Sequence, residues 1–312
     1  TITEDDSTQL SGTSAATSLN LTSAAAITNA ASTNLLVTNN ASLTGTNITL
    51  GNQLGDLINF GTLTFSSITA VNISEDSATQ LAGTSTANSL ILNSTNVLDN
   101  AAGASVTVTN NANFSALDLN LGNAAGDTFN FGTLTFNVSA GTANVAEDSS
   151  IDLLGASIAN FSIQLRSNDA VTTGQDITLP LGASLQTFVA SVFLVAGDDA
   201  VIAGNINSAQ AVLVNIDAGD AESPGTPELA AGTGGSLTIT GAISTLPFFS
   251  SGGTLLVGND DFDTFTLSPQ TTTEFRIDGG LPVAQNTGDV LALDVSGTTT
   301  PTLTVPGSLA PF

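Results

Sequence analysis

The sequence FGTLTF at residues 60–65 decides the fold, because it returns unchanged at residues 131–136, a spacing of 131 − 60 = 71 residues. Four further segments recur at the same spacing. They are Glu4–Asp5 with Glu75–Asp76, Gln9–Ser14 with Gln80–Ser85, Val37–Ala41 with Val108–Ala112, and Leu50–Asn52 with Leu121–Asn123. Collinear matches at one fixed period indicate a tandem structural repeat.

The repeat divides the chain into three regions. Residues 1–73 and 74–145 are two complete copies, and a degenerate third copy starts at residue 146 and fades after about Leu165. We therefore assign residues 1–165 to repeats and residues 166–270 to a divergent continuation of the same fold. We expect residues 271–312 to form a small C-terminal β cap or linker module, because an open stack of strands must be covered to avoid edge pairing.

Short segments of alternating apolar and polar residues fill the repeat and predict strands. Asn, Gly, Asp and Ser between these segments favour turns. The run Ala24–Ala26 lacks a sustained helical face, so we expect a strand or a corner there. The expected strands lie at Leu19–Leu21, Leu35–Val37, Asn47–Leu50, Leu63–Phe65 and Val71–Ile73.

The fold class that suits these strands is all-β, a parallel β-helix or β-solenoid in which each coil stacks on the last. A unit of this length holds about three to four coils of roughly 18–24 residues each. The alternative is one β-sandwich for each repeat, although about 100 residues is common for a sandwich. Asn39–Asn40 and Asn110–Asn111 fit side-chain ladders between stacked coils.

The second half of the chain loses the repeat but keeps strand-like runs. Residues 221–228 contain two prolines and predict a loop that bulges from the coil. Two later runs, Glu274–Ile277 and Val290–Val295, are expected strands of the C-terminal module. The other expected strands lie at Val192–Val195, Ala211–Ile216, Ser236–Ile239 and Thr254–Val257.

The charge balance excludes several kinds of partner. The chain has 27 acidic residues against two cations, Arg166 and Arg276, which gives a formal net charge of −25. Phosphate recognition needs clustered Lys or Arg, so we expect no nucleic-acid partner.

No apolar run is long enough to cross a bilayer, so we expect no membrane insertion. Because no Met precedes Thr1, we expect a processed or excised segment.

Catalysis is poorly supported, because the chain has no His, Cys or Lys. These residues are the commonest general base and the usual nucleophiles, so we expect no enzyme activity. A pair of carboxylates could still serve glycoside hydrolysis. The candidates are Asp198, Asp199, Asp217 and Asp220, and their simpler interpretation is that they are solvated turn residues. Carbohydrate platforms usually use Trp or Tyr, and the chain has neither.

Calcium is the one cofactor that the sequence suggests. Asp260, Asp261 and Asp263 cluster after Gly258 and offer the hard oxygen ligands that calcium prefers. The cluster loosely resembles a nonapeptide calcium repeat, but it occurs once and without tandem copies. The alternative is ordinary Asx-turn capping.

Eight Asn-x-Ser/Thr sequons offer glycosylation sites. Asn, Ser and Thr are so abundant here that chance accounts for many of them. The sequon asparagines are Asn20, Asn40, Asn47, Asn72, Asn93, Asn113, Asn137 and Asn160.

The segments Asn72–Ser85 and Leu119–Phe136 resemble repeats of very large planctomycete-type bacterial surface proteins, described as β-strand-repeat or filamentous-haemagglutinin-like adhesins. The resemblance covers about residues 1–165, and residues 275–289 also resemble a module of such proteins. It implies export, a repetitive β-helix and no catalytic residues. We therefore expect a secreted or cell-surface structural or adhesive protein, a subunit or segment of a filament, sheath or adhesin.

Two partners fit this expectation. One is the protein itself, through self-association or neighbouring repeats, and the other is surface glycan. The alternative function is a β-helix module that binds or degrades polysaccharide, which would require an acidic cleft on the face of the coil.

Overall fold

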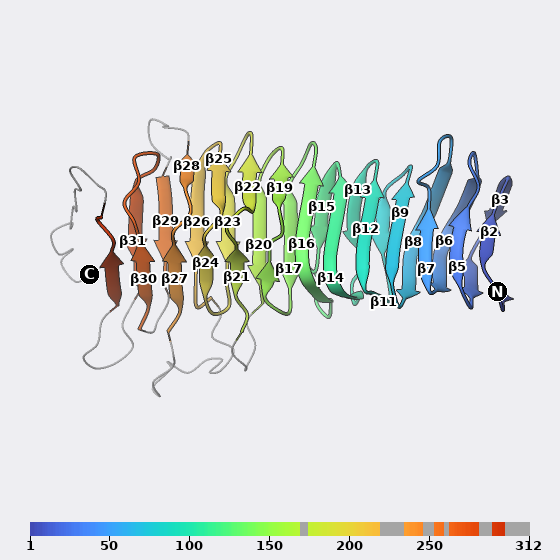
Figure 1. Cartoon of the computed structure of the whole chain (residues 1–312), viewed down its shortest axis with the longest axis horizontal. Helices are drawn as coiled ribbons and strands as arrows, with labels where there is room; N and C mark the ends of the chain where they lie inside the picture. The colour runs from blue at the N-terminus through green and yellow to red at the C-terminus, as the bar shows by residue number, and fades with distance from the viewer. Residues whose placement is uncertain (169–173, 219–233, 246–252, 259–261, 281–288, 297–312) are drawn as a thin grey trace.

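The computed structural model describes residues 1–168, 174–218, 234–245, 253–258, 262–280 and 289–296. These residues form 32 strands and no helix, and the neighbouring strands pair in parallel. The strands stack into a β-solenoid of about 12 coils that runs from the strand at Ile2–Glu4 at one end of the long axis to the strand at Val290–Leu293 at the other (Figure 1). The predicted all-β parallel solenoid is therefore confirmed, and the sandwich alternative is wrong.

Each coil has three sides, which we call X, Y and Z in the order in which the chain visits them. Side X holds β1 (Ile2–Glu4), β4 (Leu19–Ser23), β11 (Thr84–Ala87), β18 (Ile151–Asp152), β21 (Ile177–Leu179), β24 (Ala200–Ile202), β27 (Ser236–Ile239), β30 (Thr264–Leu267) and β32 (Val290–Leu293). Side Y holds β2 (Thr8–Leu10), β5 (Ala26–Asn29), β7 (Asn47–Leu50), β9 (Ala70–Glu75), β12 (Ser89–Ser94), β19 (Ala156–Ala159), β22 (Ser184–Thr187), β25 (Asn205–Ser208) and β28 (Ile243–Thr245).

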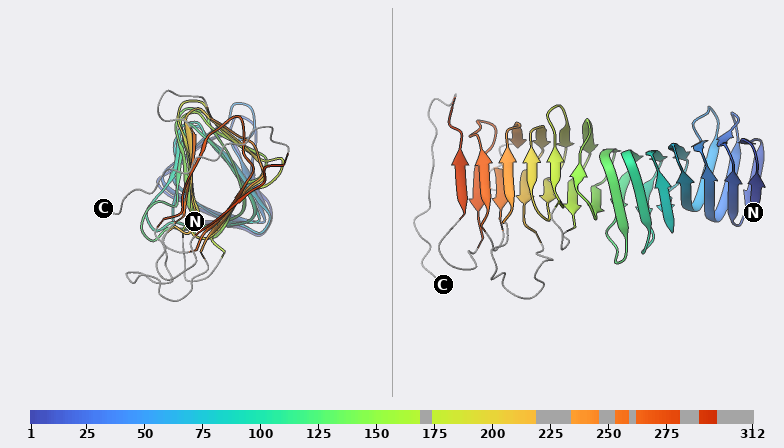
Figure 2. Two further views of the ribbon diagram at one scale, coloured as in Figure 1. Left: turned by 90° about the vertical axis from the view of Figure 1, so that its left-hand side faces the viewer. Right: turned by 60° about the horizontal axis from the view of Figure 1, so that its bottom comes forward.

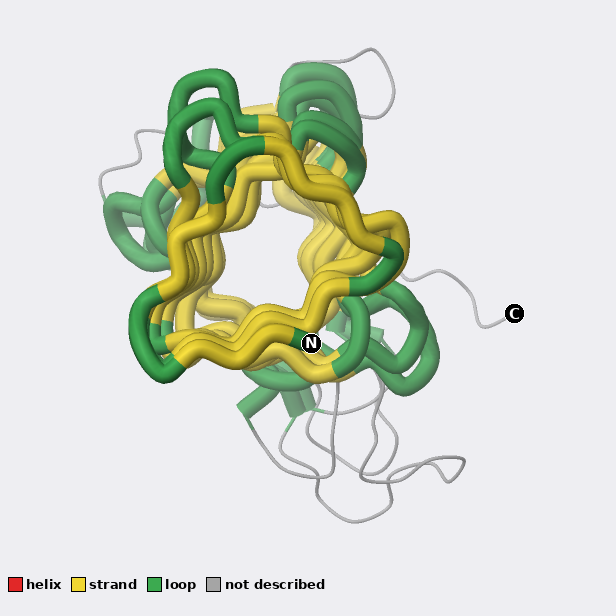
Figure 3. The backbone as a smooth tube through the Cα atoms, turned by 90° about the vertical axis from the view of Figure 1, so that its right-hand side faces the viewer, coloured by secondary structure: helices red, strands yellow, loops and turns green. Residues whose placement is uncertain are grey.

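Side Z holds β3 (Thr13–Ala16), β10 (Thr79–Leu81), β13 (Val97–Asn100), β15 (Asp118–Leu121), β17 (Ala143–Glu147), β20 (Ile163–Ser167), β23 (Val192–Val195), β26 (Ala211–Asn215), β29 (Gly253–Val257) and β31 (Phe275–Asp278). Four longer strands turn a corner and serve two sides. They are β6 (Asn34–Gly45) and β8 (Leu57–Ser67), from Z to X, and β14 (Ser105–Ala116) and β16 (Thr128–Val138), from X to Y. Seen along the axis, the sides enclose one interior (Figures 2 and 3).

The two complete repeats occupy different sides of the shaft. Strand β2 on side Y corresponds to β10 on side Z, and the corner strands β6 and β8 correspond to β14 and β16, one side further round. Counting each corner strand twice, ten sides separate β2 from β10, and 10 = 3 × 3 + 1. One repeat is thus three complete coils and one third of the next, so successive copies are rotated by a third of a turn.

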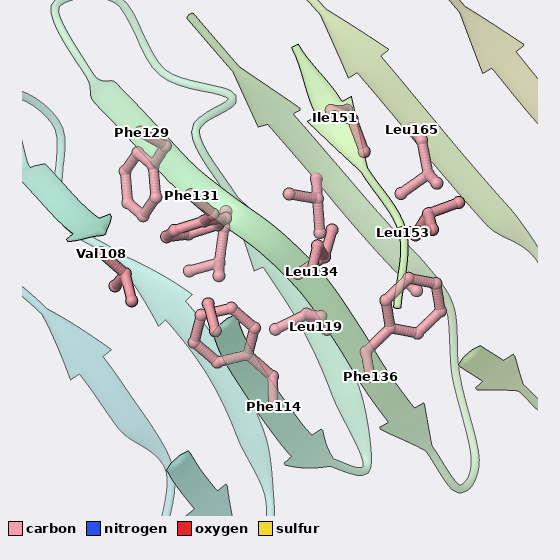
Figure 4. Close-up of a cluster of buried hydrophobic side chains, with 14 of the residues drawn as sticks. Val108, Phe114, Leu119, Phe129, Phe131, Leu134, Phe136, Ile151, Leu153 and Leu165 are labelled. Carbon is pink, nitrogen blue, oxygen red and sulfur yellow. The ribbon is translucent and has the colours of Figure 1, made fainter. Parts of the chain in front are cut away.

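The interior is filled by Leu, Ile, Val and Phe from alternate strand positions. Phenylalanines gather in the second repeat, where the rings of Phe114 and Phe131 lie 5.5 Å apart and those of Phe129 and Phe131 lie 6.0 Å apart (Figure 4). Inward side chains of one coil rest on those of the next, so the coils share one core. Burial at about 25 cal/mol per Å² of apolar surface makes this core the main stabilising term.

The FGTLTF segment forms a tight corner in each of the two complete repeats. A Cβ atom at Gly61 would lie 2.3 Å from the carbonyl oxygen of Thr38, and one at Gly132 would lie 2.1 Å from that of Thr109. Only glycine allows this approach of backbone to backbone. The repeated segment therefore marks the place where a long strand bends from one side to the next.

The strands predicted in both halves are present, and Ala24–Ala26 leads into a strand as expected. The predicted loop at 221–228 lies outside the described residues. Strands β31 and β32 pair in parallel with β29 and β30, so the described strands of residues 271–312 extend the same stack. No break separates the repeat region from its continuation, because β20 pairs with both β17 and β23.

Candidate interaction surface

Most polar motifs of the repeat hold coils together. Asp56 accepts hydrogen bonds from Asn29 Nδ2 (2.7 Å) and from the backbone N–H of Thr33 (3.1 Å) and Gln53 (2.8 Å). Asp127 repeats this role 71 residues later, with Asn100 Nδ2 at 2.8 Å. These carboxylates satisfy backbone donors where the chain leaves the strand pattern, which is a structural function.

Asparagine serves the corners of the long strands. The Asn40 side-chain oxygen accepts hydrogen bonds from the hydroxyls of Thr62 (2.8 Å) and Thr64 (3.2 Å) in the next coil. Asn111 binds Thr133 and Thr135 in the same way, at 3.0 and 3.3 Å. The expected side-chain bonds between coils thus exist, but these asparagines lie inside the long strands and not at turns, and Asn40 and Asn111 bond to threonine and not to a stacked asparagine.

The side chains of the repeated Glu-Asp motif accept hydrogen bonds from backbone N–H groups of the long strands β8 and β16. The backbone N–H groups of Ile58 and Phe60 on β8 bond to the carboxylates of Asp76 (2.9 Å) and Glu75 (3.0 Å). Glu147 and Asp148 do the same for Phe131 and Phe129 on β16, each at 2.9 Å. Side-chain oxygens therefore continue the ladder where the backbone departs from it.

Two of these acids are buried, Glu75 at 2% exposure and Glu147 at 0%. Burial raises the pKa of Glu75 to about 8 and outweighs the hydrogen bond from Phe60, which lowers it. Burial also raises the pKa of Glu147 well above its usual range. Because desolvation disfavours the ionised form, a pKa of about 8 favours the protonated state of Glu75 at neutral pH, and burial acts in the same direction on Glu147.

The candidate glycosidase acids bind backbone groups of neighbouring coils. Asp198 accepts hydrogen bonds from Gly174 and Gln175 at 2.5 and 2.9 Å, and Asp199 accepts one from Ser236 at 2.7 Å. Asp217 adopts a positive φ of 54° after β26, and Asp220 lies outside the described residues. Asp198 and Asp199 are thus half-buried and bonded between coils, and a glycosidase role for these acids stays a prediction.

The calcium prediction falls largely outside the described residues, because Asp260 and Asp261 do not belong to them. Asp263 is fully buried, and its carboxylate packs so closely on Gly258 that a Cβ there would lie 1.8 Å from Oδ2. Among the described residues no three acidic side chains gather into a metal-binding group. Calcium at this loop stays a prediction.

The sequon asparagines lie on outward positions of strands, or directly after one in the case of Asn160. Asn20 and Asn137 are exposed, and the other six are partly buried. Asn93 bonds to the hydroxyl of Ser74 at 3.0 Å, and Asn160 to the carbonyl of Ala140 at 3.2 Å. Glycosylation of any of them stays a prediction.

The outer surface of side Z changes character along the shaft. One ladder of outward residues is polar through the repeats, with Gln80, Asp99, Asn120, Asn144 and Gln164 in register. It then becomes apolar. Its next members in register are Phe193, Leu213 and Leu255.

A second ladder lies two residues further along the same strands. It contributes Val195, Asn215 and Val257. Leu255 is 41% exposed, and Phe193, Leu213 and both valines are half-buried. Five outward apolar side chains on three successive coils form a contiguous patch, which marks an interaction site more often than scattered apolar residues do. We call these five residues the side-Z stripe.

Both cations of the chain border this stripe. Arg166 is the member of the second ladder before Val195, and Arg276 is the member of the first ladder after Leu255. Both arginines are exposed and make no ion pair with any residue that the structure describes. Asp278 follows Val257 in the second ladder, so one end of the stripe carries an arginine and the other an arginine and an aspartate. Strands β20, β23, β26, β29 and β31 follow one another along the shaft in Figure 1.

A shallow hollow of about 430 Å³ lies where the polar ladder meets the stripe. Asn123, Asn144 and Gln164 line one part of it, and Arg166, Phe193 and Val195 line another. Asn144 and Asn123 both bond to Asn120, at 3.0 and 2.9 Å, so this rim is held in place.

This surface was not predicted from the sequence. The signal was present, because Val192–Val195, Ala211–Val214 and Thr254–Val257 are strands with little polar alternation. Such runs indicate a strand whose outer face is also apolar. The surface was missed because the residues that lie side by side on it depend on the lengths of the intervening loops.

No family model matches the chain. No curated protein matches it either, and no solved structure does. No helix among the described residues is long and apolar enough to span a membrane.

Proposed function

We propose that this chain is a segment of an extracellular structural or adhesive shaft. The observation that carries the proposal is what the side chains do: buried residues fill one shared core, and the repeated Asn, Asp and Glu residues form hydrogen bonds between neighbouring coils. Because each coil contacts only its neighbours, such a stack extends in one direction and forms an elongated, stiff shaft. The resemblance of residues 1–165 to surface-protein repeats supports the same role.

Immunogold electron microscopy of intact source cells tests this role. Antibodies against the repeat should label filaments, a sheath or the cell surface without permeabilisation. Labelling that appears only after the cells are opened would refute the proposal.

Polysaccharide binding is the second candidate, and the hollow beside Gln164 and Arg166 is the observation that favours it. Arginine and amide groups suit sugar hydroxyls or carboxylates, and Phe193 offers one ring for stacking. A glycan array probed with the intact chain should then give signals that are lost in Arg166→Ala and kept in Arg276→Ala. Equal signals from both variants would exclude this hollow as the binding site.

A further inference from the structure

The side-Z stripe and its charges are self-complementary. Along the first ladder the order is Gln164, Phe193, Leu213, Leu255 and Arg276. The central member is Leu213, on β26. A twofold axis that runs along β26 therefore places Leu213 opposite itself and Phe193 opposite Leu255 of a second copy.

The second ladder obeys the same symmetry. Its order is Arg166, Val195, Asn215, Val257 and Asp278. The same axis places Arg166 opposite Asp278 of the other copy, Val195 opposite Val257, and Asn215 opposite itself. Each pairing occurs twice, as it must in an isologous interface.

We propose that two copies of this chain pack face to face and antiparallel through the side-Z stripe. The apolar members cover one another, and the Arg166 guanidinium of each copy meets the Asp278 carboxylate of the other. Such an arginine–carboxylate pair is strong and specific in geometry when it is bidentate. The sheets pack about 10 Å apart, as aligned sheets do.

A parallel arrangement is less favourable. An axis along the shaft would place Asn215 opposite Leu213, so a polar amide would cover an apolar side chain on both halves of the interface. The antiparallel arrangement keeps amide with amide and apolar with apolar. Burying a polar group against an apolar one without a hydrogen bond is destabilising, so the antiparallel mode is preferred.

The size of the stripe predicts a weak, reversible dimer. Four coil spacings of about 4.8 Å and a strand of about 16 Å define roughly 300 Å² on each copy, against about 800 Å² in a standard interface. Three exposed apolar residues lie at the adjacent corner between sides Y and Z, outside the paired ladders. They are Phe161, Phe188 and Val189, which are 48%, 56% and 46% exposed.

Charge also weakens the pairing at low salt, because each copy carries a net charge of −25. At an ionic strength of about 0.15 M the Debye length is about 8 Å, so long-range repulsion is screened while contacts at the stripe remain. The pairing does not depend on where the chain works, so its failure would leave the proposed shaft role untouched.

Sedimentation equilibrium of the intact chain at about 0.15 M salt tests the proposal. We expect a monomer–dimer equilibrium that Asp278→Arg weakens at least tenfold, since the change places like charges together twice. The double variant Arg166→Asp with Asp278→Arg should restore dimerisation, whereas Arg276→Asp with Asp278→Arg should not. Leu213→Asp should abolish it, with an unchanged circular-dichroism melting curve as evidence of folding.

Three results would overturn the proposal. One is a monomer at every concentration up to the millimolar range. Another is a dimer that Leu213→Asp and Asp278→Arg leave intact, which would place the interface elsewhere. The third is rescue by the Arg276 double variant and not by the Arg166 variant, which would mean parallel packing.

Discussion

The repeat half and the divergent half share one core but differ on the outside. On side Z the ladder of the repeats ends in Asn120, Asn144 and Gln164, and the same ladder continues as Phe193 and Leu213. The inward neighbours, such as Val145 and Val214, are fully buried in both halves. Because the shared core comes from the inward positions, an outward position that makes no bond between coils is free to vary, and we infer that function resides at such positions.

The largest difference should appear when phenylalanine is removed from each half. Phe114 is fully buried and contacts the ring of Phe131, so Phe114→Ala should lower the free energy of unfolding by about 3–5 kcal/mol. Phe193→Ala, on the outer surface, should lower it by about 1 kcal/mol or less. Denaturant titration followed by circular dichroism measures both. Equal losses would mean that Phe193 is a core residue and the stripe is not a free surface.

The next largest effect concerns pH. The pKa of Glu75 is about 8 in the folded chain, against an unperturbed value of 4.5, so folding holds a proton that the unfolded chain releases. The contribution of protonated Glu75 to the free energy of unfolding is therefore fully present below about pH 4.5 and is lost as pH rises towards 8. Glu75→Gln keeps an acceptor for the Phe60 N–H and removes this loss. It should raise the melting temperature at about pH 9 and change it little at about pH 4.

Glu4 provides the matched control, because it occupies the same place in the first repeat but is exposed. Glu4→Gln should leave the melting temperature unchanged at both values of pH. A similar response of the two variants would mean that the effect comes from net charge and not from burial.

Removing a capping carboxylate should have an intermediate effect. Asp127→Ala leaves Asn100 and the N–H groups of Gly103 and Ala124 without their acceptor, and should cost about 1–3 kcal/mol. Asp278→Ala in the divergent half should change stability within about 0.5 kcal/mol, because Asp278 is exposed. Monomeric samples at low protein concentration keep dimerisation out of the comparison. A loss at Asp278 as large as that at Asp127 would contradict the division between structural and surface acids.

The smallest expected effect distinguishes two outward threonines. Thr135 bonds to Asn111 and to the carbonyl of Leu154 at 2.7 Å, so Thr135→Val should cost about 0.5–1.5 kcal/mol. Thr238 on β27 has no hydrogen bond from its side chain to any described residue, so Thr238→Val should be neutral. Hydrogen exchange of the adjacent strands gives a local measure of both. A neutral Thr135→Val would mean that the corner bonds of the repeat contribute nothing.

The sequence was sufficient to predict the fold, because FGTLTF and four other segments recur at one spacing and the strands between them are short. The rotation of the repeat could not be predicted from that spacing. The rotation follows from the number of sides in one repeat, which is ten. The number of residues in a side varies, because Gly61 lets a strand bend from one side to the next without a loop. In the sequence, a repeat that spans a whole number of coils looks the same as a repeat that spans a whole number of coils and one third of another.

The site residues were harder to predict. Glu75 lies in an acidic, turn-like segment, and only its position under β8 reveals that it is buried. Arg166 and Arg276 are 110 residues apart in the sequence (276 − 166), and both lie at one surface because the strands between them stack in register. The segments between these strands differ in length, so the sequence alone does not reveal that register. Asp260 and Asp261 were candidates because they cluster with Asp263 after Gly258, and they lie outside the described residues.

The stacking of one repeat on the next is tested most directly by a disulfide across their boundary. The chain has no cysteine, and the hydroxyls of Ser66 and Thr86, which belong to different repeats, lie 3.3 Å apart on adjacent coils. The double variant Ser66→Cys with Thr86→Cys should oxidise to an intramolecular disulfide in the native protein and not in denaturant, because the pairing brings the two Cβ atoms within reach. Failure of this pair to close, with a folded circular-dichroism spectrum, would contradict a shared interior and a continuous shaft.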